Sequence, residues 1–74
     1  MGKHEMLVFL NAVSCLFQQE IISPKKRIFL VTEWKGAVEK KNKSRALEIL
    51  DEVFSLSDDF QKKTLSIIYE KMEG

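Results

Sequence analysis

The residues able to do chemistry are few and scattered in this 74-residue chain. His4 is the single histidine and Cys15 the single cysteine, while Asp58 and Asp59 are adjacent carboxylates. Nucleophilic catalysis needs a thiol or hydroxyl beside a general base, and a zinc site needs several His, Cys or acidic ligands together. One histidine close to the start of the sequence supplies neither set. We therefore expect no enzymatic activity, no metal site and no cofactor.

The remaining reactive groups have simpler structural interpretations. Cys15 lies in an apolar segment without a nearby basic residue, which is the environment of a packing residue and not of a reactive thiolate. Asp58 and Asp59 stand where a helix is expected to begin, and carboxylates there accept hydrogen bonds from free N–H groups. Gly36 stands alone, so no glycine-rich phosphate loop is present. A single cysteine forms no internal disulfide, which is typical of the reducing cytoplasm.

The segment from Met6 to Gln19 contains no charged residue, although 31% of the chain is charged. A spanning helix needs about 20 predominantly apolar residues, whereas Asn11, Ser14 and Gln18 interrupt this shorter run. Glu5 also adds a negative charge where a secretion signal needs a positive start. The segment therefore predicts neither a membrane helix nor a signal peptide. It indicates a helix covered by protein on nearly all sides, in a cytoplasmic protein.

Periodicity and cap residues predict an all-α fold, a small four-helix bundle that forms one domain over residues 1–74. Ser23 and Pro24 end the first helix and start the second, because proline disfavours helical geometry before it and fits the first helical position. Ser44 is expected to cap the third helix, and Ser57 or Asp58 the fourth. The connections are short, which favours antiparallel hairpins. The expected helices cover about residues 5–22, 24–41, 45–56 and 58–72.

One segment of the predicted third helix has a family resemblance. The stretch ALEILDEVFSL, residues 46–56, resembles the second helix of a tetratricopeptide-type hairpin in its order of alanine and large apolar residues. The Trp, Gly and Tyr signature of the preceding helix is not in register, and such repeats need about three units for stability. The resemblance implies a helical hairpin and no particular function.

The first helix has a single polar line, formed by Asn11, Ser14 and Gln18 at spacings of three and four. Three short helices of the same chain would cover such a helix in a monomer, whereas a second copy would cover it in a two-fold dimer. We expect a homodimer through this helix, because the core of so short a chain is small. Polar groups near the dimer axis would then fix the register. The expected interface residues are Phe9, Leu10, Asn11, Val13, Ser14, Leu16, Phe17 and Gln18.

The second helix places an aromatic residue on its polar face. At 100° per residue, Phe29 lies about 140° from Trp34 and at nearly the same azimuth as Gly36. An aromatic ring beside a glycine is a plausible docking feature, although Phe29 could instead cover the loop after Ile22. We expect a small protein-protein interaction module, a regulator, inhibitor or adaptor, that binds another protein. The expected partner-binding residues are Phe29 and Gly36, ringed by Lys26, Glu33 and Lys40.

The uneven distribution of charge supports an alternative. Residues 23–45 contain eight basic and two acidic residues, a balance of +6, whereas residues 46–74 contain three and seven, a balance of −4. The alternative is a small nucleic-acid-binding regulator that uses the basic ends of the second helix. A helix-turn-helix is disfavoured, since Asp58 and Asp59 would face the phosphates. The residues of this alternative site are Lys25, Lys26, Arg27, Lys40, Lys41, Lys43 and Arg45.

Overall fold

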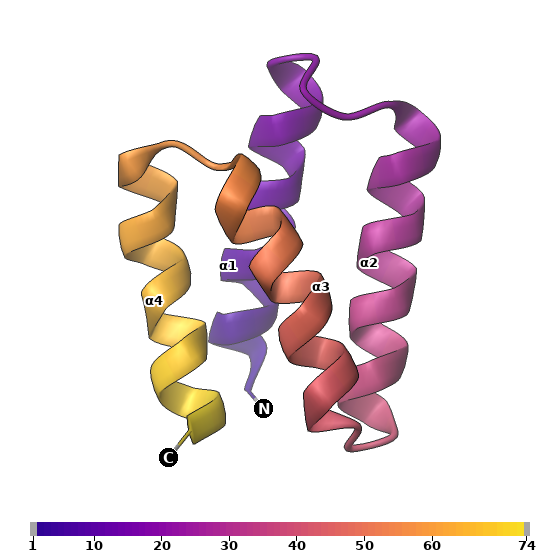
Figure 1. Ribbon diagram of the computed structural model, residues 1–74, viewed down its shortest axis with the longest axis vertical. Coiled ribbons are helices and arrows are strands. Elements are labelled where there is room, and N and C mark those ends of the chain that lie inside the picture. Colours follow the sequence, from indigo (N-terminus) through magenta and orange to yellow (C-terminus); the bar gives the residue numbers. More distant parts are fainter. Residues whose placement is uncertain (1, 74) are drawn as a thin grey trace.

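The computed structural model describes the backbone of residues 2–73 and the side chains of residues 2–72. This part of the chain forms four helices and no strand, which confirms the all-α, four-helix prediction. The connections that follow the first and third helices lie at the top of Figure 1, and the one between the second and third lies at the bottom. Residues 1 and 74 of the predicted domain lie outside the described part. The helices are α1 (Lys3–Gln18), α2 (Pro24–Glu39), α3 (Lys43–Leu56) and α4 (Asp59–Glu73).

The first helix ends earlier than predicted. Helix α1 stops at Gln18 and not near residue 22, because Glu20 adopts a left-handed conformation with φ of 60°. The N–H of Ile21 then donates to the carbonyl of Leu16 at 2.9 Å, and the N–H of Glu20 donates to that of Phe17 at 3.0 Å. This pair of bonds is the Schellman motif, whose left-handed residue is usually glycine. A glutamate in that place gave no stop signal in the sequence.

The connection between α2 and α3 repeats this arrangement and corrects two predicted boundaries. Lys41 has φ of 57°, and the N–H of Asn42 donates to the carbonyl of Ala37 at 2.8 Å, so α2 ends at Glu39. Asn42, and not Ser44, caps α3, since its Oδ1 accepts from the N–H of Arg45 at 3.2 Å. One asparagine therefore closes α2 and opens α3, and α3 begins two residues before the predicted start.

Two other predicted caps are confirmed. The Ser23 Oγ accepts a hydrogen bond from the N–H of Lys26 at 3.1 Å, with proline at the first position of α2. Asp58 fulfils the same role for α4, because its Oδ1 accepts from the N–H of Gln61 at 2.9 Å. Each of these bonds satisfies a backbone donor that the first helical turn leaves free.

The core lies where the four helices meet: α1 and α3 each contact the other three helices, whereas the backbones of α2 and α4 do not approach each other in the described structure. Its centre is the stacked pair of Phe9 and Trp34, with ring centroids 4.1 Å apart and planes inclined by 10°. The same chain thus covers most of α1, while Asn11 and Gln18 stay exposed.

No described helix has both the length and the apolar character needed to cross a bilayer.

Candidate functional site

The five residues predicted to bind a partner form one stripe along α2. They follow one another at spacings of three and four, which places them on one helix face, the side that borders α3. Phe29 remains 47% exposed in the middle of charged neighbours. The structure therefore brings these residues together, and we call them the Phe29 stripe: Lys26, Phe29, Glu33, Gly36 and Lys40.

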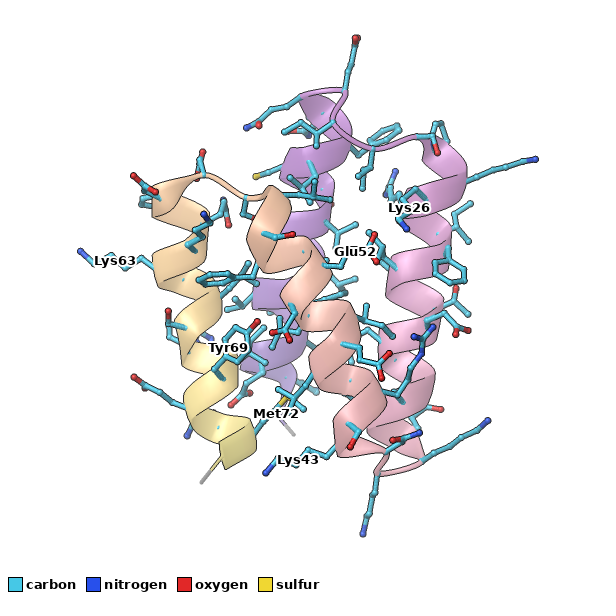
Figure 2. All side chains as sticks on the ribbon, viewed as in Figure 1. Lys26, Lys43, Glu52, Lys63, Tyr69 and Met72 are labelled. Atoms are coloured by element: carbon cyan, nitrogen blue, oxygen red, sulfur yellow. The ribbon has the colours of Figure 1, made fainter. Side chains whose placement is uncertain are left out.

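An ion pair fixes the upper end of the Phe29 stripe. The ammonium group of Lys26 lies 2.6 Å from a carboxylate oxygen of Glu52 on α3, and Figure 2 shows the two side chains pointing toward each other. The same ammonium lies 5.4 Å from the centroid of the Phe29 ring, within cation–π range. Lys26 is thus held between a carboxylate and an aromatic face, and its position defines one edge of the exposed ring.

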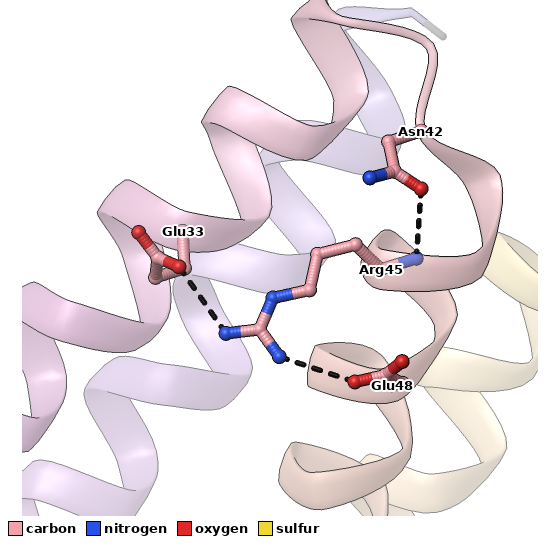
Figure 3. Close-up of polar contacts among 4 residues, drawn as sticks. All are labelled: Glu33, Asn42, Arg45 and Glu48. Atoms are coloured by element: carbon pink, nitrogen blue, oxygen red, sulfur yellow. Dashed lines mark hydrogen bonds and ion pairs between the residues drawn. The ribbon is translucent and has the colours of Figure 1, made fainter.

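A second ion-pair group lies further along the stripe. The Arg45 guanidinium on α3 donates to Glu33 on α2 at 3.2 Å and to Glu48 on its own helix at 3.1 Å (Figure 3). These hydrogen bonds, that with Glu33 first, raise the pKa of Arg45 above its ordinary value. The guanidinium therefore stays charged and spans the seam between the helices. Because all these side chains are partly exposed, solvent screens each pair and each contributes little to stability.

Gly36 provides the hollow that the sequence suggested. A Cβ atom built on Gly36 would meet no neighbouring atom within 4 Å. The glycine lines a shallow depression of about 140 Å³ together with residues that include Glu33, Lys40 and Arg45. The aromatic residue and this depression lie on the same stripe, two helical turns apart, as the azimuths predicted.

The opposite flank of α2, toward α1, has a different chemistry. No carboxylate lines the groove there, and its one charged residue, Arg27, lies over the ring of Phe17 at 4.9 Å from the centroid. Ile28 borders the groove with 66% of its surface exposed. The sequence reasoning missed Ile28, although its azimuth, about 120° from Trp34, already placed it outside the buried arc. The lining of this α1–α2 groove is Leu10, Val13, Ser14, Arg27, Ile28, Val31 and Thr32.

The predicted dimer interface needs correction in three positions. Phe9, Val13 and Leu16 are buried in the core of this chain, at 0%, 1% and 2% exposure, so their side chains offer almost no surface to a second copy. Phe17 is half-buried below Arg27. Periodicity alone did not distinguish the face of α1 that packs in the core from the face at the surface, because both carry apolar residues. The predicted residues that remain at or near the surface are Leu10, Asn11, Ser14 and Gln18.

The basic residues of the nucleic-acid alternative do not form one surface. Lys25 and Arg27 lie at the start of α2, and Lys40, Lys41 and Lys43 lie around its other end, about 24 Å away at 1.5 Å per residue. Lys26 and Arg45 are engaged with carboxylates, as described above. The exposed cations around the α2–α3 connection are the larger of the two groups.

The residues considered for catalysis remain apart. His4 is exposed on the first turn of α1, and the half-buried Cys15 accepts a hydrogen bond from the Gln61 side chain, with Nε2 and Sγ 3.3 Å apart. Within residues 2–72, no three His, Cys, Asp or Glu side chains gather as metal ligands. Tyr69 donates a hydrogen bond to Asp51 across the α3–α4 seam; burial first, and then this bond, raise the pKa of Tyr69.

Comparisons with protein families, with curated proteins and with solved structures give no match to this chain.

Proposed function

We propose that this protein is a cytoplasmic interaction module, a regulator, inhibitor or adaptor, that binds a partner protein through the Phe29 stripe and has no catalytic activity. The observation that carries the proposal is the half-exposed ring of Phe29 between two ion pairs, on the same stripe as the depression at Gly36. Aromatic residues ringed by polar groups are the usual anchors of protein interfaces.

The charged residues beside Phe29 indicate which kind of surface the partner would present. Lys26 and Glu33 are already positioned by α3, so binding would cost little side-chain entropy at the rim. The partner would offer an apolar pocket for the Phe29 ring and polar groups of both signs around it. Burial of an aromatic anchor in this way is commonly worth at least about 2 kcal/mol.

The experiment is affinity capture from the source cell with four matched baits: the wild-type chain, Phe29→Ala, Phe29→Glu and the control Lys35→Ala. Lys35 is exposed on the same helix but outside the stripe. We expect a protein retained by wild type and Lys35→Ala to be lost from both Phe29 variants, whose circular dichroism stays helical. Equal retention by all four baits would exclude the stripe as the binding site.

A second candidate function, self-association, is supported by the α1–α2 groove. We infer that a second copy packs there, with Ile28 of one protomer entering the groove of the other. A protruding residue and a groove on one surface are mutually complementary under a two-fold axis. The surface contains no carboxylate and only one cation, so two copies meet without strong charge repulsion. The exposed Asn11 and the half-buried Ser14 would then fix the register.

Sedimentation equilibrium at low micromolar concentration tests the dimer. Wild type and Phe29→Glu are expected to sediment as dimers, and Ile28→Glu as a monomer, because the new carboxylate would be buried against an apolar groove. Ile28→Glu and Phe29→Glu introduce the same charge at adjacent positions on different flanks of α2, so each variant is the control for the other. A strictly monomeric wild type would exclude the homodimer.

Nucleic-acid binding is the alternative, supported by the exposed Lys40, Lys41 and Lys43 around the α2–α3 connection. No ion pair engages these three lysines within the described residues. A titration with random duplex DNA tests it: micromolar affinity that falls steeply with salt supports phosphate binding. Absence of binding at about 50 mM salt, where such contacts are strong, removes this alternative.

A further inference from the structure

The depression at Gly36, at the lower end of the Phe29 stripe, has more positive than negative charge in its lining. Its charged residues are Glu33 and Lys40 from α2 and Arg45 from α3. Its volume of about 140 Å³ lies well below the roughly 300 Å³ at which small-molecule sites begin. The depression therefore has room for one side-chain group of a partner and not for a whole ligand.

Hydrogen-bond donors reach this depression from both helices. The Arg45 guanidinium donates to Glu33 and Glu48 and carries further N–H groups beyond those two. Asn42 uses its Oδ1 to cap α3, and its Nδ2 group makes no hydrogen bond among residues 2–72. The ammonium group of Lys40 is exposed and takes part in no ion pair among the same residues. Three side chains thus have N–H groups left for an acceptor.

Two of these donors are held in place by the chain itself. Figure 3 shows the guanidinium of Arg45 between the carboxylates of Glu33 and Glu48, which fix its orientation. The amide of Asn42 is fixed in the same way, because its oxygen accepts the N–H at the start of α3. Donors that are already ordered lose little side-chain entropy when a partner binds.

The charge of the lining distinguishes between the groups that could enter. A cation would be repelled by Lys40 and Arg45, and an apolar group would leave the donors without an acceptor. A phosphate carries close to two negative charges and would lie beside Glu33, which lines the same space. One carboxylate balances the two cations and one anion of the lining, and its oxygens accept several hydrogen bonds.

We infer that the depression at Gly36 binds the side-chain carboxylate of an Asp or Glu residue of the partner protein, while Phe29 enters the apolar pocket of that partner. The inference rests on the proposed function and names the charge that the partner presents. Phe29 and Gly36 lie two helical turns apart, about 10 Å along α2. An extended segment covers this distance in about three residues. The acidic residue of the partner is therefore expected about three positions from the contact with Phe29.

Selection from a library of random dodecapeptides, displayed on phage through their C-termini, tests the inference with the full chain. Only side-chain carboxylates are available in such peptides. The baits are the wild type, Phe29→Ala, Lys40→Glu and the control Lys35→Glu, which makes the same charge change outside the stripe. We expect the wild type and Lys35→Glu to enrich peptides with an acidic residue, Lys40→Glu to lose them, and Phe29→Ala to retain none of them.

Isothermal titration with one enriched peptide then measures the carboxylate contact. Replacing its acidic residue by the matching amide should weaken binding to the wild type about tenfold, the usual effect of losing a hydrogen bond to a charged group. The same replacement should cause no loss with Lys40→Glu, in which the new carboxylate would repel the acidic peptide. A phosphoserine in place of the acidic residue should bind the wild type less tightly than the acidic peptide.

The possible failures separate this inference from the proposed function. Peptides that depend on Phe29 but show no excess of acidic residues, or that bind Lys40→Glu as tightly as the wild type, would overturn the carboxylate site alone. Tighter binding of the phosphoserine peptide would overturn it in favour of a phosphate. If no enriched peptide depends on Phe29, the proposed function fails and the carboxylate site fails with it.

A second variant keeps the test available if Lys40→Glu does not fold. Lys40→Gln removes the charge without placing a carboxylate at the C-terminus of α2, where negative charge is unfavourable. It should reduce the difference in affinity between the acidic peptide and its amide counterpart. An unchanged difference in this variant, with helical circular dichroism, would also overturn the carboxylate site.

Discussion

The two flanks of α2 contact their neighbouring helices through different kinds of side chain. Toward α3, side chains of opposite charge span the seam: Lys26 reaches Glu52, and Glu33 reaches Arg45. Toward α1, no carboxylate lines the groove, and the isoleucine beside it is mostly exposed. On the first flank, Lys26 and Glu33 have partners on α3, whereas Ile28 on the second flank stays mostly exposed in the described part of the chain.

Two adjacent residues represent this difference. Phe29 belongs to the flank with the ion pairs and Ile28 to the flank without them, since neighbouring residues on a helix are separated by about 100°. Both are large, exposed apolar residues, but the sequence analysis singled out Phe29 and missed Ile28. Their surroundings separate them: a rim of fixed charges suits a different protein, while a neutral groove suits a second copy.

The largest effect is expected from a substitution at Trp34, because it would disturb both flanks of α2 at once. Trp34 forms the buried base of α2 and stacks on Phe9, so Trp34→Ala should lower the free energy of unfolding by about 3–5 kcal/mol. Chemical denaturation followed by circular dichroism measures the loss. The Nε1 donor of Trp34 has no partner in the described structure, so Trp34→Phe should cost distinctly less. A change below 1 kcal/mol in Trp34→Ala would contradict the central role of this stack.

The second prediction is that substitutions at Ile28 and Phe29 have opposite effects on self-association and on partner binding. Ile28→Glu should weaken self-association at least tenfold and leave partner capture intact, whereas Phe29→Glu should do the reverse. Sedimentation and affinity capture on the same preparations measure both effects. Parallel loss of both activities in one variant, with its helical content unchanged, would show that the flanks do not act separately.

A smaller effect of opposite sign is expected at Gly36. Glycine inside a helix is destabilising by roughly 0.5–1 kcal/mol relative to alanine, and the added Cβ of Gly36→Ala would meet no atom within 4 Å. The variant should therefore unfold at a higher denaturant concentration. It should also bind a partner less well, because the methyl group occupies the depression on the Phe29 stripe. Increased stability with unchanged partner affinity would mean that the depression has no role in binding.

The smallest expected effect concerns the ion pairs themselves. Arg45→Ala removes the contacts with Glu33 and Glu48, and should lower stability only slightly, because the pairs are partly exposed and screened by solvent. The difference from wild type should shrink in 1 M salt, which screens exposed charges. A salt-independent loss would indicate that the arginine stabilises the seam by packing instead.

Local chemistry made much of this fold predictable. Ser23 with Pro24, and Asp58, are recognisable starts because their side chains bond to donors only a few residues away. The same holds for the stripe on α2, since residues three and four apart share a face in any helix. The two Schellman ends were not predictable, because Glu20 and Lys41 occupy positions where glycine is the usual signal.

The sequence by itself determined that this chain forms four helices, that Ser23 caps α2, and that Phe29 and Gly36 share one side of α2. Only the tertiary structure decided which apolar residues of α1 are enclosed, that Lys26 and Glu33 of α2 are paired with α3, and that Glu5 and three distant lysines line one cavity. Periodicity specifies the faces of each helix, but the neighbour that covers each face depends on how all four helices pack together.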